Sequence, residues 1–283
     1  MSAPVALVTG ASTGIGRTTA LHLAARGWEV LAGVRTDAAA ASLEEVDGVR
    51  PVLLDVTDPT SVKAAAGVVA EVAGPRGLAG LVNNAGIQAV GPLELLPVDR
   101  VRDVLETNVL GQVAVTQSLL PQLRAGTGRI VFLSSLSGAV ALPFLGAYAA
   151  SKHAVEAIGD SWRRELRPHG IRVAIVEPGN IATPIWDKGL DPAPMDALGP
   201  DLRRLYGSGV DFTVAQARHA AEVAIPPERV AAAIEHALTA RRPRQRYLVG
   251  TDARIAVRLQ RHAPRLLDRL LTAAMERDAR RRT

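Results

Sequence analysis

The sequence predicts a single α/β domain, a doubly wound and mainly parallel sheet of seven strands with helices on both faces. Short apolar runs rich in Val, Ile and Leu alternate with Ala-rich segments of helical period, which is the pattern of repeated βαβ units. With 283 residues, 48% of them hydrophobic, the chain can form a substantial buried core. No shift in composition marks a second domain, so residues 1–283 are treated as one unit.

The apolar runs predict the strands in order along the chain. They cover residues 5–9, 29–34, 50–54, 79–83, 129–134, 171–177 and 246–249. The helices are expected between them, with Gly27, Gly128 and Gly170 as stop signals. They cover residues 14–26, 59–72, 98–123, 147–167 and 227–240.

Two segments depart from this alternation. Residues 183–226 hold several Pro and Gly and show weak periodicity, which is typical of a substrate lid. Ile185, Trp186 and Met195 in this segment indicate either a lipophilic pocket or the core of the lid itself. Residues 251–283 predict a basic, helical C-terminal extension.

Charge is unevenly distributed along the chain. The net charge is +5, and from residue 241 onward there are 13 Arg against 4 acidic residues. No aromatic residues are interleaved to stack on bases, so we expect no nucleic-acid partner, whereas peripheral contact of the tail with a membrane stays open.

Composition also limits the chemistry. The chain has no Cys, which excludes disulfides and thiolate metal sites, and its six His residues lack paired ligand spacing, so no metal is expected. The N-terminus lacks a basic leader. The uncharged stretch at 130–151 is long enough to span a bilayer, but Ser, Gly and Pro interrupt it, so a buried strand and loop are expected instead. We therefore expect a cytoplasmic location and no transmembrane span.

A glycine-rich turn, TGASTGIG, follows the first expected strand. Gly10, Gly14 and Gly16 would stand where a strand turns into a helix, and glycine there allows a tight turn and close approach of the backbone to a pyrophosphate. Glycines at such a turn can also serve packing alone. The position after the first strand favours nucleotide binding.

The second strand ends at Val34 and is followed by Arg35. Many NAD-binding folds carry an acid here for the ribose hydroxyls, whereas arginine suits a 2′-phosphate. This predicts a preference for NADP(H), with NAD(H) remaining possible if Arg35 is only a surface cation.

Two further strand ends carry polar residues. Asp55 follows the third strand, where it could accept a hydrogen bond from an adenine amino group, and Asp58 could cap the next helix. The fourth strand ends in NNAG, residues 83–86, which is either a plain turn or a contact with the cofactor.

Tyr148 and Lys152 are four residues apart and share one helix face. The chain has only three Tyr and three Lys, so this pairing is unexpected by chance. A nearby ammonium and an oxidised nicotinamide would both lower the pKa of the phenol, and a shift of ~3 units corresponds to about 4 kcal/mol. The structural alternative is a lysine that extends past a half-buried tyrosine.

Other polar residues surround this pair in the expected fold. Ser135 ends the fifth strand and could donate to a developing alkoxide, although Ser134 and Ser137 offer the same chemistry. Asn108 lies in an apolar stretch of a helix, where it could bond locally and bend the helix or hold a water near Lys152.

Together these motifs resemble the short-chain dehydrogenase/reductase family, over nearly the whole chain and in the expected order. TGASTGIG is similar to its TGxxxGxG loop, NNAG matches its fourth-strand signature, and Asn108, Ser135, Tyr148 and Lys152 match its catalytic tetrad. The resemblance implies a Rossmann-type fold and hydride transfer between nicotinamide and an alcohol or carbonyl. In it Tyr148 passes the proton, Ser135 holds the oxygen, Lys152 binds ribose and lowers the pKa of the tyrosine, and Asn108 completes a proton path through water.

The resemblance also implies a set of cofactor contacts, several of them through the backbone. Besides Tyr148 and Lys152 they are Gly10, Ser12, Thr13, Gly14, Ile15, Gly16, Arg35, Asp55, Val56, Asn83, Ala85, Gly86, Pro178, Gly179, Ile181 and Thr183. Many NADP(H)-dependent members have a basic residue where this chain has Thr13, so the cofactor prediction rests on Arg35.

The resemblance extends to the substrate and the assembly. The C-terminal extension is similar to the tails of members that act on steroids, retinoids and other lipophilic alcohols, so a lipophilic alcohol or ketone is expected as substrate. A homodimer or homotetramer is also implied. The competing interpretation is a nucleotide-binding regulator without turnover.

Overall fold

The computed structural model describes residues 2–182, 199–222 and 224–282. Its seven strands form one sheet in the order β3-β2-β1-β4-β5-β6-β7, and every neighbouring pair is parallel. The strands are β1 (Val5–Val8), β2 (Glu29–Val34), β3 (Val49–Leu53), β4 (Gly80–Asn83), β5 (Arg129–Leu133), β6 (Arg172–Pro178) and β7 (Arg246–Val249). The predicted fold class is confirmed, and the expected strand ends differ by one residue at most.

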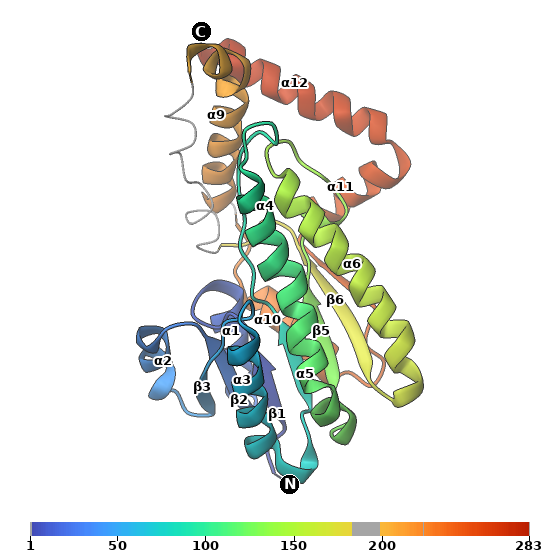
Figure 1. Ribbon diagram of the computed structural model, residues 1–283. Coiled ribbons are helices and arrows are strands. Elements are labelled where there is room, and N and C mark those ends of the chain that lie inside the picture. The colour runs from blue at the N-terminus through green and yellow to red at the C-terminus, as the bar shows by residue number, and fades with distance from the viewer. Residues whose placement is uncertain (1, 183–198, 223, 283) are drawn as a thin grey trace.

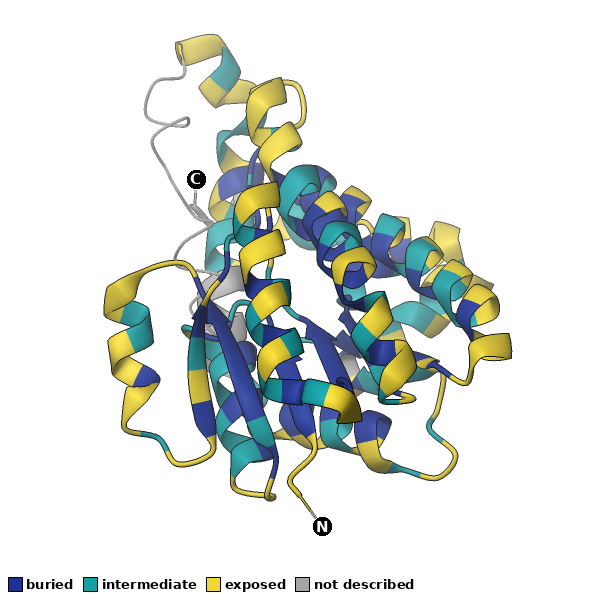
Figure 2. Ribbon diagram, turned by 60° about the horizontal axis from the view of Figure 1, so that its bottom comes forward, coloured by how far each residue is buried: buried dark blue, intermediate teal, exposed yellow. Residues whose placement is uncertain are grey.

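Helices cover both faces of the sheet (Figure 1). One face carries α1 (Gly14–Ala24), α2 (Asp37–Glu44) and α10 (Glu228–Thr239), and the other carries α3 (Pro59–Ala73), α5 (Gly111–Ala125) and α6 (Gly146–Leu166). Along β1 the side chains alternate between two separate cores, with Ala6 and Val8 in one and Val5 and Leu7 in the other. Figure 2 shows the result, since the strands are mostly buried and the outer faces of the helices exposed.

The helix expected at 98–123 is divided into three parts. It consists of α4 (Val98–Leu105), the π-helical turn η2 (Glu106–Leu110) and α5. A π-turn inserts an extra residue into the helical repeat, and here Asn108 lies within it. Short 3₁₀ turns connect other elements: η1 (Gly74–Arg76), η3 (Leu136–Gly138) and η4 (Arg167–His169).

Three helices lie beyond the carboxyl ends of the strands, at the top of Figure 1 or to its upper right. They are α9 (Pro200–Glu222), α11 (Thr251–His262) and α12 (Pro264–Arg282). The described part of the expected lid is therefore largely one long helix, which weak periodicity did not predict. The expected helical C-terminal extension is present as α11 and α12, and α12 packs against α9.

Local signals explain several of these boundaries. Asp58 caps α3, because its side chain accepts a hydrogen bond from the Thr60 amide at 2.8 Å and Pro59 opens the helix. Gly27 and Gly170 adopt φ values of 81° and 77° after α1 and η4, as expected of stop signals.

Two searches over the described residues gave negative results. No helix among them combines the length and apolar character needed to cross a membrane. Nor do their His, Cys, Asp and Glu side chains gather in groups of three or more that could bind a metal ion.

Candidate active site

A cavity of about 630 Å³ lies at the carboxyl ends of the central strands. Its wall is built from the segments that follow β4, β5 and β6, from the first turns of α6, and from α9 and α12. The residues that line it include Ile15, Asn84, Gly86, Ser134, Ser135, Ser137, Leu142, Leu145, Tyr148, Lys152, Pro178, Gly179, Ile181, Phe212, Leu271 and Met275.

Tyr148 and Lys152 lie together on the cavity side of α6. Both side chains are buried, and the Lys152 Nζ lies 5.6 Å from the centroid of the Tyr148 ring. The same Nζ donates a hydrogen bond to the Leu133 carbonyl at 2.7 Å, which fixes the lysine against the end of β5. The structure thus brings into one site the pair that the spacing on a helix predicts.

Ser135 is the serine that reaches the tyrosine. Its side chain hydrogen bonds with Tyr148, and its Oγ accepts from the Ser137 amide at 3.1 Å. The Ser134 hydroxyl is buried and has no hydrogen-bond partner among the described residues. Of the three serines that the sequence left open, geometry places Ser135 against the tyrosine.

Burial dominates the protonation of both groups. It raises the pKa of Tyr148 to about 12, although the Ser135 hydrogen bond acts in the opposite direction. It lowers the pKa of Lys152 to about 8, while the carboxylate of Glu156 raises it. The lowering expected from the nearby ammonium is therefore not found, because burial outweighs the Ser135 hydrogen bond and the pKa of Tyr148 lies above its ordinary value of 10.

Asn108 connects two segments of the chain next to Tyr148 through hydrogen bonds of its side-chain amide. Its Nδ2 donates to the Ile87 carbonyl at 2.8 Å and to the Ser151 Oγ at 2.9 Å, and its Oδ1 accepts from the Ile87 amide at 2.8 Å. Ser151 in turn donates to the Tyr148 carbonyl at 2.7 Å. The Asn108 side chain therefore joins the segment after β4 to α6 through partners distant in sequence. These three hydrogen bonds use most of the donors and acceptors of its amide group.

The glycine-rich turn has the geometry of a phosphate-binding loop. Gly10 and Gly14 adopt φ values of 64° and 55°, which favour glycine. A Cβ on Gly16 would lie 2.3 Å from the Gly10 carbonyl oxygen and 2.4 Å from the Asn84 Nδ2, so only glycine lets α1 begin here. Thr13 precedes α1 and makes no side-chain cap. These features fit a pyrophosphate held at the start of α1.

One predicted contact after β4 is placed elsewhere. The Asn83 side chain is fully buried and donates to the Thr116 Oγ1 at 2.9 Å, so it faces α5 and not the cavity. The next residue, Asn84, lines the cavity and donates to the Thr9 and Gly10 carbonyls at 2.8 and 3.1 Å. The Asn83 side chain therefore joins the sheet to α5, and of the two asparagines in the NNAG motif it is Asn84 that lines the cavity.

The residues expected around the adenine lie outside the cavity. Arg35 is exposed at the end of β2. Although burial raises the pKa of Asp55, hydrogen bonds from Thr57 and the nearby Arg35 guanidinium lower it below the ordinary value. Val56 is buried, and a Cβ on Gly111 would lie 2.7 Å from it, so its side chain packs against α5. Arg35 and Asp55 thus lie near each other beyond the cavity, at the ends of β2 and β3.

The segment after β6 supplies the opposite wall. Pro178, Gly179 and Ile181 line the cavity, and the Gly179 amide donates to the Val249 carbonyl at 2.8 Å. Thr183 lies outside the described residues. The same is true of three residues named for the lid: Ile185, Trp186 and Met195.

Sequence reasoning missed the residues that close the cavity. Asn84 stood in the NNAG motif, but the motif does not show which of its two asparagines faces the ligand. Phe212 on α9 and Leu271 and Met275 on α12 carry no motif. The spacing of Leu271 and Met275, four residues apart, was the one available signal of a shared apolar face.

Comparison with known proteins shows the family to which the chain belongs. The family described as short chain dehydrogenase matches residues 4–192, and the chain belongs to that family. Retinol dehydrogenase 5 of Mus musculus is 38% identical over 283 residues, covering 96% of this chain and 89% of its own. The NADPH-dependent 3-dehydrocapnine reductase of Ornithobacterium rhinotracheale is 36% identical over 255 residues, covering 87% of each. A short-chain dehydrogenase structure from Streptomyces avermitilis superposes with a TM-score of 0.75 at 30% identity, covering 100% of this chain and 98% of that one. The protein is thus an oxidoreductase of the short-chain dehydrogenase class.

Proposed function

We propose that this protein is an NADP(H)-dependent alcohol dehydrogenase or ketone reductase that acts on a lipophilic substrate. The observation that carries the proposal is the hydrogen-bonded pair of Tyr148 and Ser135, with Lys152 beside it, at the wall of the cavity. A nucleotide-binding regulator would not need a tyrosine, a serine and a lysine gathered at the wall of one cavity.

In the direction of reduction, Tyr148 gives its proton to the carbonyl oxygen of the substrate. The Ser135 hydroxyl holds that oxygen, and the Lys152 ammonium stabilises the phenolate that remains. A reduced nicotinamide, when bound, would supply the hydride to the carbonyl carbon. In the direction of oxidation, Tyr148 takes the alcohol proton, and the oxidised nicotinamide would accept the hydride.

The cofactor would lie along the carboxyl edge of the sheet. The glycine turn at residues 10–16 would hold its pyrophosphate, Asn84 and Gly86 would flank its ribose, and the segment at residues 178–181 would hold the carboxamide. At the adenosine end of the cofactor, Arg35 would bind a 2′-phosphate, because its side chain is exposed and a guanidinium suits a phosphate. Asp55 lies near it.

The cavity wall supports a lipophilic substrate. Besides the three polar catalytic side chains it presents Leu142, Leu145, Ile181, Phe212, Leu271 and Met275. Apolar walls with a few polar groups fix the reacting atom of an otherwise hydrophobic ligand. The similarity to a retinol dehydrogenase is consistent with this class of alcohol.

A turnover assay tests the proposal. Purified protein is incubated with NADPH or NADH and a panel of lipophilic ketones and aldehydes, and oxidation is followed by absorbance. We expect turnover with a kcat/KM at least about tenfold higher for NADPH, and an Arg35→Ala variant that loses most of this preference without losing turnover with NADH. A tenfold preference for NADH would contradict the cofactor assignment, and NADPH binding without turnover on any substrate would favour the regulator.

A further inference from the structure

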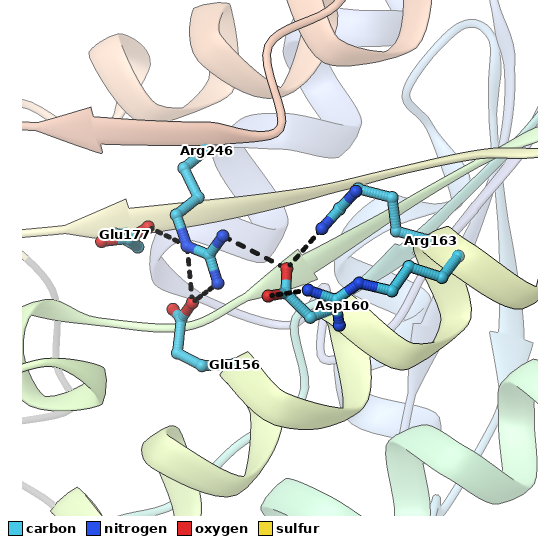
Figure 3. A network of polar contacts seen from close by, with 6 residues as sticks. Glu156, Asp160, Arg163, Glu177 and Arg246 are labelled. Atoms are coloured by element: carbon cyan, nitrogen blue, oxygen red, sulfur yellow. Dashed lines mark hydrogen bonds and ion pairs between the residues drawn. The ribbon is translucent and has the colours of Figure 1, made fainter. Parts of the chain in front are cut away.

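A cluster of charged side chains joins α6 to β6 and β7 (Figure 3). We call it the α6 charge cluster. Its members are Glu156, Asp160, Arg163 and Arg164 of α6, Glu177 of β6, and Arg246 of β7.

Arg246 is the centre of this cluster. Its Nη2 lies 2.9 Å from the Glu156 Oε2, its Nη1 lies 3.2 Å from the Asp160 Oδ1, and its Nε lies 3.3 Å from the Glu177 Oε1. Arg163 and Arg164 also contact Asp160, at 3.2 and 3.3 Å. Asp160 therefore has three guanidinium partners, whereas among the described residues Glu156 has one, that of Arg246.

Glu156 is the member that faces the catalytic residues. It follows Lys152 by four residues on the same helix, so the two side chains share one face. Only its Oε2 is bonded to Arg246, while its Oε1 is buried and has no hydrogen-bond partner among the described residues. That oxygen lies 3.2 Å from the position a Cβ on Gly138 would take, beside Ser134 at the cavity wall. Part of a carboxylate is thus left free close to the lysine.

Lys152 needs such a charge. Lys152 is only 4% exposed, and its Nζ donates a hydrogen bond to a neutral group, the Leu133 carbonyl. Burial without an opposite charge favours the neutral amine, which could not stabilise a phenolate on Tyr148. Among charged groups of the described residues, Glu156 is the one whose charge acts on Lys152 in the opposite sense to burial.

We propose that Glu156 is a positioning residue of the reaction, whose carboxylate, held in place by Arg246, keeps Lys152 in the ammonium form beside Tyr148. The inference deepens the proposed function and rests on it, since the ammonium matters only if Tyr148 transfers a proton. The other members face Lys152 less directly, because Asp160 lies a further turn along α6 and Arg163 bonds to Asp160.

The rival explanation is a purely structural role, in which the cluster only attaches α6 to the sheet. Loss of either acid of α6 would then weaken the attachment without a specific effect on the lysine. Asp160→Asn therefore serves as the matched control for Glu156→Gln, since both variants remove one carboxylate partner of Arg246 and preserve side-chain shape.

The small number of lysines allows Lys152 to be observed directly. The chain has three, Lys63, Lys152 and Lys188, so a Lys63→Arg/Lys188→Arg background labelled with ¹³C-lysine leaves one side-chain NMR signal. Its chemical shift is followed against pH without cofactor or substrate. In the parent we expect a pKa of about 8 for Lys152. Glu156→Gln should lower that pKa by about one unit, and Asp160→Asn should change it far less.

The kinetic arm connects the titration to the reaction. In Glu156→Gln, the alkaline limb of the pH profile of kcat/KM for alcohol oxidation should shift to lower pH, by about as much as the pKa of Lys152 does. The affinity for NADPH at neutral pH should stay as in the parent. An unmoved Lys152 titration, equal shifts in both variants, or a moved titration with an unchanged pH profile would each overturn the inference. Because the titration needs no turnover, a chain without activity would contradict the proposed function separately.

Discussion

At the scale of single residues, Glu177 connects the electrostatics of the site to the stability of the fold. The side chain is 3% exposed, and burial raises its pKa from the ordinary 4.5 to about 7. The Glu156 carboxylate acts in the same direction, while Arg246 acts against it. The folded protein therefore holds a proton on Glu177 in a pH range where the unfolded chain has already lost it.

This difference predicts a pH dependence of stability. As pH rises from about 4.5 to about 7, the unfolded state releases the Glu177 proton before the folded state does, so the free energy of unfolding falls across that window. Glu177→Gln cannot ionise and should lack this fall. Relative to the parent it should gain on the order of 2 kcal/mol between about pH 5 and pH 8, measured by urea unfolding.

Asp160→Asn is the control for this measurement. Burial raises the pKa of Asp160, but bonds from Arg246 and Arg163 outweigh it and hold the pKa below its ordinary value of 3.8. The stability that the ionised Asp160 contributes is present above pH 3.8 and is lost only as pH falls below it. Asp160→Asn should therefore lower the free energy of unfolding by about the same amount at pH 5 and at pH 8. A Glu177→Gln variant that differs from the parent by the same amount at both would contradict the account.

Single residues also show which side chains of the site could be predicted from the sequence. Tyr148 and Lys152 were predictable because a four-residue spacing on a helix places two side chains on one face. The position at the strand end left three serines open, and only the family resemblance selected Ser135. Asn83 and Asn84 were not separable in this way. Successive strand residues face opposite sides of the sheet, so a shift of one residue exchanges the buried asparagine for the one at the cavity.

At the scale of elements, α12 has a role that the sequence did not predict. The sequence predicts a basic helical extension, whereas in the structure α12 forms part of the cavity wall. One face of this helix carries Leu271 and Met275 toward the cavity, whereas Leu270 is 46% exposed. The contact with α9 is close, because a Cβ on Gly209 would lie 3.3 Å from the Met275 Cε. The C-terminal helix therefore takes part in shaping the space for substrate.

Two neighbouring leucines test this role. Leu271→Ala should lower kcat/KM for a long lipophilic ketone by about tenfold, because it removes apolar contact from the cavity wall. It should have little effect on a short ketone that does not reach α12. Leu270→Ala removes the same side chain from the exposed face and should leave both substrates unaffected. Equal effects of the two variants, or an equal loss with long and short ketones, would remove α12 from the binding site.

Helices without a strong periodic signal were the least predictable elements. In α2 the one buried residue is Leu43, so no apolar stripe marks the helix, and Thr36 caps it by accepting from the Ala39 amide at 3.3 Å. The helix α9 lies in a Pro- and Gly-containing region whose weak periodicity predicted a substrate lid but no particular helix. By contrast, α1, α3 and α6 pack against the sheet along their length and were expected.

At the scale of the whole molecule, the two halves of the site come from the sequence in different ways. The edge of the sheet at which we propose the cofactor binds is formed by turns directly after β1, β2 and β4, so each part is local in sequence. The remaining wall of the cavity combines α6 with α9 and α12, which are distant in sequence and meet only in the folded chain. This is why class and chemistry followed from motifs, whereas the walls of the cavity required the structure.

The central claim is that Tyr148 is the proton donor, and single-turnover reduction by a Tyr148→Phe variant tests it most directly. The variant keeps the ring but loses the hydroxyl, so NADPH binding, followed by fluorescence, should stay close to the parent value. The rate of hydride transfer to a lipophilic ketone should fall by at least about 100-fold, since general acid catalysis contributes that much or more. A variant that binds NADPH and still transfers hydride within about tenfold of the parent rate would contradict the account.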